Sequence, residues 1–398
     1  MINGDQIDDI VATAVEQGQA PGVVAAVARG DAAHVTAAGV MAVGGPPMQD
    51  NTMRDSTVFR ISSITKPITA AVILSLIDDG LLRLDEPVDT LLPELAGRRV
   101  VRRPDGPLTD TIVAERAVCV RDLLTFTWGF GMQGAMFMAP SPWPIVAAAQ
   151  ERELASFGPP MPASTPDPDT FMARLGELPL LAQPGERWLY QAGSQVLGVL
   201  AARAGGAAFE DVMRERVLGP LGMDDTAFYA ADTGRLATAY EKGEVSDPPD
   251  GQWSKPPRFP DGGGGLVSTA GDLLAFGRML LRGGASVVPG GAPVLRPGTV
   301  AEMTRDQLTP AQRAAVWPGF SFLEDRGWGY GVSVLPGGGY GWEGGLGTAW
   351  FNVPELDLTV VVLTQRAADE TGMPAVCADV LSAAVLSAAV LSAATASR

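Results

Sequence analysis

A serine and a lysine three residues apart are the pair in this chain best suited to chemistry. Among 18 serines and three lysines, only Ser63 and Lys66 have this order and spacing. At the start of a helix, the spacing places the hydroxyl and the amine about one turn apart on the same face. The amine can then take the hydroxyl proton while the oxygen attacks a carbonyl carbon. Roughly one such chain in seven would show the spacing by chance, so the surrounding sequence has to decide.

The single histidine, His34, limits the choice of base. A Ser-His-Asp triad or a histidine-rich metal site would have to use it. His34 lies in an alternating polar and apolar stretch that is typical of a strand, and we interpret it as a structural or solvent-facing residue. A serine nucleophile in this chain therefore needs lysine or tyrosine as its base. We expect no metal and no other cofactor.

Composition narrows the possible partners. The net charge of −16 and the pI of about 4.5 argue against nucleic acid and against an anionic membrane surface. Only three of the 29 basic residues are lysines, which favours a specific role for Lys66. Cys119 and Cys377 are isolated, and we predict two buried free thiols. The acidic N-terminus shows no secretory signal, so we expect a cytoplasmic protein with a small-molecule partner and leave its oligomeric state open.

The elements around the pair are predicted from periodicity and turn residues. Two strands over 22–28 and 34–40 are separated by an Arg-Gly-Asp turn that is typical of a hairpin. A helix is predicted from Lys66, with Pro67 in its first turn, to a stop at Gly80. This helix is apolar on nearly all faces and is therefore expected to be buried. Burial lowers the pKa of a lysine from its usual value of roughly 10.4.

The rest of the chain divides into a mostly helical middle and a strand-rich end. Three strands are predicted within 329–334, 346–351 and 358–363, and the Ala-rich tail is predicted as a helix covering the sheet. The expected fold class is therefore α/β (α+β), an antiparallel sheet flanked by terminal helices plus a helical subdomain. We predict that residues 1–85 and 290–398 form the sheet subdomain and residues 86–289 the helical one, with the active site between them. The segment from Met132 to Pro168 either lines an acyl pocket or packs on the core as an ordered loop.

The motifs around the pair resemble those of the serine β-lactamase and penicillin-binding-protein superfamily. Residues 59–67, Phe-Arg-Ile-Ser-Ser-Ile-Thr-Lys-Pro, match its nucleophile segment, in which only Ser63 has a lysine three positions later. Further similar stretches are residues 78–88, 120–126, 220–226 and 264–269. Within the superfamily, nearly the whole chain looks most like the β-lactamase-like family VIII carboxylesterases. The resemblance implies their β-lactamase-like fold.

Two further motifs carry departures from the β-lactamases. The second motif, Tyr-x-Asn, corresponds to Tyr190-Gln191-Ala192, with the tyrosine present and the asparagine absent. The third, Lys-Thr-Gly, corresponds to Trp342-Glu343-Gly344 on an expected edge strand, and the tryptophan agrees with the esterase variants. Without the amide and the cation that would hold a β-lactam, ester hydrolysis is the better supported activity.

The resemblance also implies a role for each residue of the site. Ser63 is the nucleophile, and Lys66 and Tyr190 move the protons, with the tyrosine either as a phenolate or as a relay. The backbone N–H groups of Ser63 and Gly345 form the oxyanion hole. The residues expected to contact substrate are Trp342, Gly344, Phe126 and Ala192.

A serine esterase is the leading hypothesis. The first alternative is an acyltransferase on the same scaffold, in which an alcohol or amine outcompetes water. Weak β-lactamase or D-amino-acid peptidase activity is the second, and a non-catalytic binding protein with the same fold is the third. The sequence alone does not identify the acyl chain or the alcohol.

Overall fold

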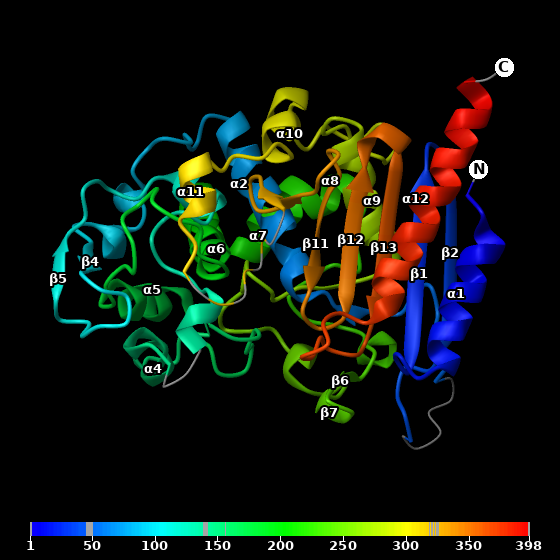
Figure 1. The fold of residues 1–398 in the computed structure, drawn as a ribbon, viewed down its shortest axis with the longest axis horizontal. Helices are drawn as coiled ribbons and strands as arrows, with labels where there is room; N and C mark the ends of the chain where they lie inside the picture. Colours follow the sequence, from blue (N-terminus) through cyan, green and yellow to red (C-terminus); the bar gives the residue numbers. More distant parts are fainter. Residues whose placement is uncertain are drawn as a thin grey trace.

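A seven-stranded sheet forms the centre of the computed structural model, which describes residues 2–44, 51–137, 142–155, 157–317, 319, 321, 323 and 326–396. All of its strand pairs are antiparallel, in the order β2-β1-β13-β12-β11-β10-β9. Its strands are β1 (Gly22–Arg29), β2 (Ala32–Gly39), β9 (Gly327–Trp328), β10 (Ser333–Val334), β11 (Tyr340–Gly344), β12 (Thr348–Val353) and β13 (Leu358–Thr364). The two ends of the chain therefore build one sheet, as expected (Figure 1).

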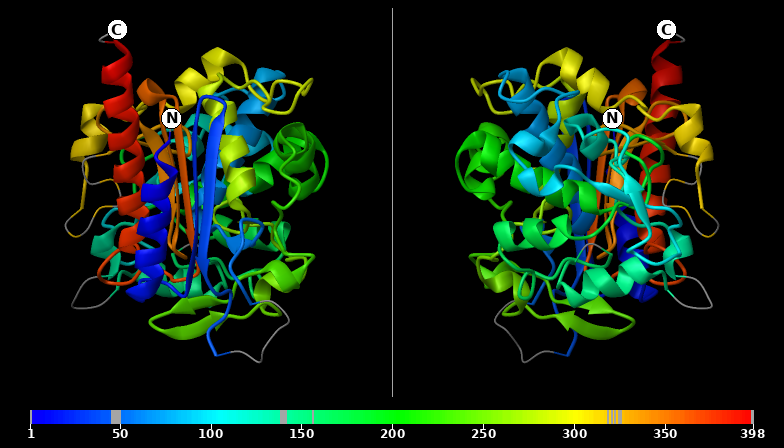
Figure 2. Two further views of the ribbon diagram at one scale, coloured as in Figure 1. Left: turned by 90° about the vertical axis from the view of Figure 1, so that its right-hand side faces the viewer. Right: turned by 90° about the vertical axis from the view of Figure 1, so that its left-hand side faces the viewer.

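Strand β1 shows how the sheet is covered on both faces. All its residues from Gly22 to Ala28 are buried, and successive side chains of a strand point to opposite faces. Val24 and Ala26 belong to the core that includes α2 (Thr65–Asp78) and α9 (Ala270–Leu281). Val23 and Val27 pack with α1 (Gly4–Glu16) and α12 (Ala375–Ala396). Figure 2 shows α1 and α12 side by side on one face of the sheet, which confirms that the terminal helices flank it.

Helices and loops dominate the chain between β2 and β9. The remaining helices are α3 (Val120–Leu124), α4 (Pro144–Glu151), α5 (Pro168–Gly176), α6 (Ala192–Gly205), α7 (Phe209–Met213), α8 (Gly219–Leu221), α10 (Pro297–Met303) and α11 (Pro310–Ala314). The same region contains three two-stranded sheets: β3 (Phe59–Arg60) with β8 (Val267–Ser268), β4 (Arg99–Val101) with β5 (Thr111–Val113), and β6 (Ala239–Glu241) with β7 (Glu244–Asp247). The β-lactamase-like α+β fold class is confirmed, whereas the boundaries of the two subdomains stay a prediction.

The segment that carries Ser63 is fixed from both sides. Strand β3 leads into a 3-10 turn over Ser62–Ile64, and α2 follows without a break. Arg60 in β3 forms a buried ion pair with Asp247, with Nε 2.7 Å from Oδ2. Thr348 Oγ1 at the start of β12 donates to the carbonyl of Ile61 at 3.0 Å. These contacts attach the turn to β7 on one side and to the seven-stranded sheet on the other.

Helix α2 is buried along most of its length, as its apolar composition predicts. Every residue from Thr65 to Leu76 is buried, and the helix ends at Asp78. Gly80 follows with a φ of 77°, the left-handed conformation in which glycine commonly terminates a helix. The lysine of the pair therefore enters the interior with the helix that carries it.

Strand β11 is an inner strand of the sheet, between β12 and β10, but the part that carries the third motif has a strand partner on one side only among the described residues. Within the described ranges, its neighbour β10 pairs only with Tyr340 and Gly341, and the part from Trp342 to Gly344 has β12 as its only strand partner. The expectation of an edge strand therefore holds for the motif but not for the strand as a whole. Such an open stretch leaves backbone groups available for a bound molecule.

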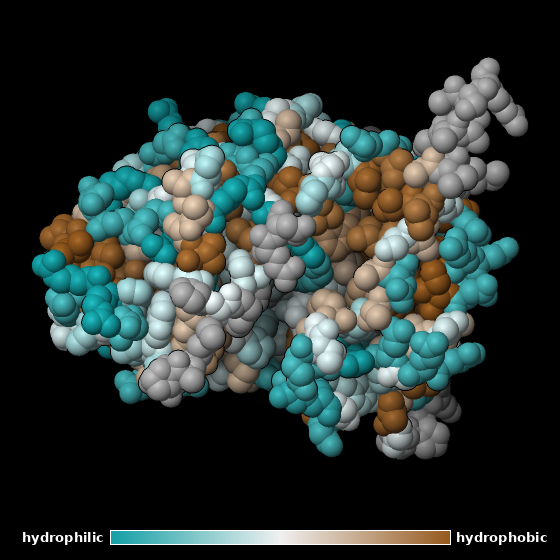
Figure 3. Space-filling view, in the orientation of Figure 1, coloured by the Kyte–Doolittle hydropathy of each residue, from teal (hydrophilic) through white to brown (hydrophobic). Residues whose placement is uncertain are grey.

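The cysteines, the helices and the surface also bear on what the composition predicts. Cys119 and Cys377 are free, as predicted, and Cys377 is buried. The prediction of burial is wrong for Cys119, which lies at the N-cap of α3 and is only partly buried. Across the described ranges, no helix combines the length and apolar character needed to cross a membrane. The same residues contain no group of three or more His, Cys, Asp or Glu that could hold a metal ion. Figure 3 shows hydrophilic residues over much of one face, with apolar residues gathered around α12 and the adjoining strands.

Candidate active site

Ser63 and Lys66 meet as their spacing predicts. Lys66 Nζ lies 2.8 Å from Ser63 Oγ, and it also donates to the carbonyl oxygen of Gly263 at 2.5 Å. Lys66 is fully buried, while Ser63 retains 8% of its surface exposed. The serine oxygen is thus the part of the pair that solvent or a substrate can reach.

Tyr190 reaches the same serine oxygen from the other side. Its Oη donates to Ser63 Oγ at 2.9 Å, and the indole Nε1–H of Trp342 donates to Tyr190 Oη at 2.8 Å. An indole N–H can only donate, so the phenol oxygen accepts from Trp342. The phenol hydrogen is thereby directed at Ser63. The structure brings Tyr190 and Trp342, from two distant segments, to the turn and helix that carry Ser63 and Lys66.

Burial sets the protonation states of the two candidate bases in opposite ways. Desolvation lowers the pKa of Lys66 to about 7, against the opposing effect of the Asp261 carboxylate. Desolvation raises the pKa of Tyr190 far above its usual value, despite its hydrogen bonds to Ser63 and Trp342. A neutral amine is therefore accessible near pH 7 and a phenolate is not. Of the two roles expected for Tyr190, the geometry and the pKa shifts favour the relay.

An aromatic cluster surrounds Tyr190 and excludes water from it. Its members are Phe126, Trp188, Tyr190, Trp328 and Trp342. The Tyr190 ring centroid lies 5.7 Å from Trp188 and 5.5 Å from Trp342, and Trp328 lies 5.0 Å from Trp342. Stacked, tilted and edge-on ring pairs at such distances stabilise each other beyond simple burial. The cluster therefore fixes the position of the Tyr190 ring.

Phe126, expected to contact substrate, has a different position. Its side chain is completely buried, and its ring meets Tyr190 edge-on at 6.0 Å and Trp328 at 4.8 Å. The structure therefore places Phe126 behind Tyr190 rather than on an accessible wall.

Glycines let β11 approach the turn that carries Ser63. A Cβ at Gly344 would collide with the carbonyl oxygen of Ile61 and with Thr348 Oγ1. Gly345 follows in open space, where a Cβ would meet nothing within 4 Å. Within the described part of the chain, the N–H of Gly345 donates to no backbone carbonyl. The arrangement leaves this N–H available near the nucleophile, as an oxyanion hole requires.

Three residues in or beside the site, Ser62, Phe126 and Gln191, have a positive φ. Ser62, just before the nucleophile, has a φ of 47°, and Phe126 has a φ of 58°. Gln191, just after Tyr190, has a φ of 89° and a ψ of −75°, close to a rare and strained γ-turn. Such conformations cost energy and persist where surrounding contacts hold them, often at functional sites. Here they flank the serine and the tyrosine.

The second motif and the expected pocket segment meet at Tyr190. Ala192 begins α6 and is fully buried, so its methyl group offers no hydrogen bond to a substrate. Met132 forms two backbone hydrogen bonds with Tyr190, at 2.9 and 3.0 Å. The segment from Met132 to Pro168 thus begins beside the site, and residues 138–141 and 156 within it lie outside the described residues.

Asp261 is a buried carboxylate next to the site that sequence reasoning missed. It accepts hydrogen bonds from Gly263 N–H at 2.6 Å and from Gln195 Nε2 at 3.0 Å. Burial raises its pKa, while Lys66 and these donors lower it. The available signal was an aspartate directly before four consecutive glycines, Asp261 to Gly265, because glycines allow a backbone to wind closely around a side chain.

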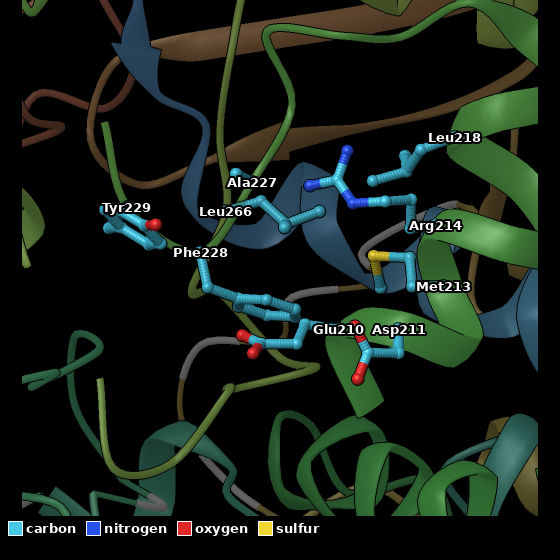
Figure 4. Close-up of a pocket in the computed structure, with 9 residues that line it drawn as sticks. All are labelled: Glu210, Asp211, Met213, Arg214, Leu218, Ala227, Phe228, Tyr229 and Leu266. Atoms are coloured by element: carbon cyan, nitrogen blue, oxygen red, sulfur yellow. The ribbon is translucent and has the colours of Figure 1, made fainter. Parts of the chain in front are cut away.

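A well-formed pocket elsewhere in the fold contains none of these residues. It has a volume of about 200 Å³ and lies beside α7, with Glu210, Arg214, Phe228 and Leu266 in its wall (Figure 4). Leu266 in its wall contacts the start of the nucleophile helix, where its N–H donates to Thr65 Oγ1 at 3.2 Å. We therefore place no reacting substrate in this pocket.

Comparisons with known proteins bear on the family and the fold of the chain. The model of the Beta-lactamase family matches residues 7–381. The chain is 38% identical over 351 residues to Protein Rv1367c of Mycobacterium tuberculosis (strain ATCC 25618 / H37Rv), covering 82% of this chain and 80% of that protein. It is 29% identical over 408 residues to Esterase EstB of Burkholderia gladioli, covering 94% and 93%. The solved structure of EstCE1, a hydrolase with promiscuous acyltransferase activity, has a TM-score of 0.77 and 24% identity over 96% of this chain and 97% of its own.

Proposed function

Because the chain belongs to the Beta-lactamase family, we propose that it is a serine hydrolase that cleaves carboxylic esters through an acyl-enzyme on Ser63. The observation that carries the proposal is the position of Ser63 Oγ between Lys66 Nζ at 2.8 Å and Tyr190 Oη at 2.9 Å. A nucleophile that has both a base and an acid within hydrogen-bond distance meets the geometric requirement for acyl transfer. The esterase activity named for the relative EstB supports the choice of esters.

In the proposed acylation, Ser63 Oγ attacks the ester carbonyl carbon and its proton moves to the neutral amine of Lys66. The N–H groups of Ser63 and Gly345 stabilise the negative oxygen of the tetrahedral intermediate. When the intermediate collapses, the carbon–oxygen bond to the alcohol breaks and Tyr190 Oη donates a proton to the departing oxygen. Tyr190 regains a proton from the Lys66 ammonium, so the site returns to its initial charge.

Deacylation reverses the same proton transfers with water as the acceptor. Water attacks the acyl carbonyl carbon and gives its proton to Lys66. The bond to Ser63 Oγ breaks, and the serine oxygen takes a proton back as the carboxylic acid leaves. Since nothing in the Ser63, Lys66 and Tyr190 arrangement distinguishes water from an alcohol, transfer to another acceptor is the alternative outcome.

Activity on a panel of esters and one cephalosporin tests this proposal. We expect turnover of p-nitrophenyl esters from acetate to dodecanoate, with kcat/KM at least about 100-fold above that for nitrocefin. The reason is that Ala192 and Trp342 provide neither the amide nor the cation that would orient a β-lactam. Nitrocefin turnover equal to ester turnover would contradict the substrate class. Product ratios with added alcohols or amines separate hydrolysis from acyl transfer.

The pH dependence of kcat/KM follows from the state of Lys66. Only the neutral amine accepts the Ser63 proton, and the pKa of Lys66 is lowered to about 7 by burial. We expect kcat/KM to rise about tenfold per pH unit below pH 7 and to level off above it, because the neutral fraction then approaches one. The raised pKa of Tyr190 keeps the phenol protonated across this range. A midpoint near the usual lysine value, about 10, would contradict the role of Lys66.

A further inference from the structure

Asp261 carries a buried charge that the proposed acyl transfer does not use. Its side chain is 5% exposed, and each carboxylate oxygen accepts one hydrogen bond. Oδ1 accepts from the N–H of Gly263 at 2.6 Å, and Oδ2 accepts from Gln195 Nε2 at 3.0 Å. Two directed donors hold the carboxylate in one orientation. Burial of a charged group costs free energy, so a role for this carboxylate has to be sought.

The backbone of Gly263 connects this carboxylate to the site. Its N–H is bound to Asp261, and its carbonyl oxygen accepts from Lys66 Nζ at 2.5 Å. The backbone is wound tightly around the aspartate, since a Cβ at Gly265 would lie 2.9 Å from the Asp261 carbonyl oxygen. On the other side, Thr69 of α2 donates to the carbonyl of Gly262 at 2.8 Å. The loop is therefore held to the same helix that carries Lys66.

We propose that Asp261 is a positioning residue of the Ser63 site: its carboxylate holds Gly263 through the N–H, so that the carbonyl oxygen of the same residue holds Lys66 Nζ against Ser63 Oγ. Lys66 has Ser63 and Gly263 as hydrogen-bond partners. Held by both, the amine is kept at the distance needed to take the serine proton. Without the carboxylate, the Gly263 N–H loses its charged partner and the carbonyl loses its fixed direction.

The same carboxylate also tunes the charge of Lys66. Within the described part of the chain, the groups that face the Lys66 amine are Asp261, the neutral phenol of Tyr190, the hydroxyl of Ser63 and the carbonyl oxygen of Gly263. The Asp261 carboxylate is the negative one, and it raises the pKa of Lys66 against the larger effect of burial. Removing the carboxylate charge therefore lowers the pKa of Lys66. A purely structural aspartate elsewhere in the fold would not have this effect.

Asp261→Asn tests the inference with little change in shape. The Asn Oδ1 still accepts from Gly263, and Gln195 can rotate its amide because its Oε1 has no partner among the described residues. Asp272→Asn is the control: Asp272 is a partly buried carboxylate that accepts from Thr226 Oγ1 at 2.7 Å, and burial raises its pKa to about 6, but it does not act on the pKa of Lys66. The probe is the ¹³Cε signal of Lys66 in the full chain, with the exposed Lys242 and Lys255 as references.

We expect the Lys66 titration midpoint to fall by about one pH unit in Asp261→Asn and to stay unchanged in Asp272→Asn. We also expect kcat for p-nitrophenyl acetate to fall at least about tenfold in Asp261→Asn, with KM nearly constant. An unchanged Lys66 midpoint would overturn the inference, as would equal losses of kcat in both variants. Only the kinetic part rests on the proposed function; the NMR titration needs no turnover, so failure of the inference and failure of the function are distinguishable.

Gln195→Met keeps the inference testable if Asp261→Asn does not fold. This change removes the donor to Asp261 Oδ2 and leaves the carboxylate charge in place. We expect kcat to fall at least about threefold because the carboxylate is less firmly oriented, while the Lys66 midpoint stays within about 0.3 pH unit. An unchanged kcat would contradict the positioning role.

Discussion

Replacement of Ser63 by alanine is expected to lower ester hydrolysis by at least about 10³-fold while the protein stays folded. The change removes one oxygen, to which Lys66 and Tyr190 both bind. Both partners keep a second contact, since Lys66 still donates to Gly263 and Tyr190 still accepts from Trp342. The loss would therefore reflect missing nucleophilic chemistry rather than a collapsed site. Ester hydrolysis rates and a thermal unfolding curve of the same preparation measure the two effects.

Ser62→Ala is the matched control for Ser63→Ala. Ser62 is adjacent, also buried and held at a φ of 47°, but Lys66 and Tyr190 direct their hydrogen bonds to Ser63 Oγ instead. Alanine costs about the same as serine at this φ, so the control keeps the strain. We expect a fluorophosphonate to add one adduct to the native chain and to Ser62→Ala, and none to Ser63→Ala, by intact mass. Labelling of Ser63→Ala would place the nucleophile elsewhere.

Local spacing explains why the Ser63 and Lys66 contact could be predicted. Both side chains lie within one turn at the start of a single helix, so their distance depends on the helix alone. The burial of that helix was also readable, because apolar residues occupy nearly all its faces. The N-terminal hairpin followed in the same way from a turn sequence between two apolar runs.

Contacts between distant segments could not be derived from periodicity. Tyr190 and Trp342 lie 127 and 279 positions beyond Ser63 in the printed sequence, and only the resemblance of their motifs indicated that they meet it. The hydrogen bond between them depends on how the aromatic cluster packs, which no local pattern encodes. Phe126 shows that a role implied by the resemblance need not match the packing. It lies within a matching stretch, yet its ring is buried against Tyr190.

Asp261 shows a second limit. In the sequence it precedes four glycines and resembles an ordinary loop aspartate, for which solvent exposure is the usual expectation. Its burial follows from the packing of α6, where Gln195 donates to it, against the loop that reaches Lys66. A buried carboxylate becomes visible only when its partners from separate segments are placed together. The two subdomain boundaries likewise depend on tertiary contacts and stay a prediction.

Replacement of Tyr190 by phenylalanine is expected to reduce activity in a way that depends on the leaving group. The change removes Oη, which donates to Ser63, and leaves the ring to fill its place in the aromatic cluster. A phenol whose pKa is strongly raised is suited to deliver a proton to a departing alkoxide rather than to take one from serine. An alkyl alcohol needs that proton to leave, whereas p-nitrophenolate leaves without it.

We therefore expect Tyr190→Phe to lower kcat/KM by about 10²–10⁴-fold for an ethyl ester and by about tenfold or less for the p-nitrophenyl ester of the same acid. Trp342→Phe is the companion variant, because it removes the N–H that directs the phenol but keeps Oη itself. It should show the same dependence on the leaving group with a smaller loss. Equal losses for both esters in Tyr190→Phe would contradict a proton-donating role, because a base that activates Ser63 is needed whichever alcohol departs.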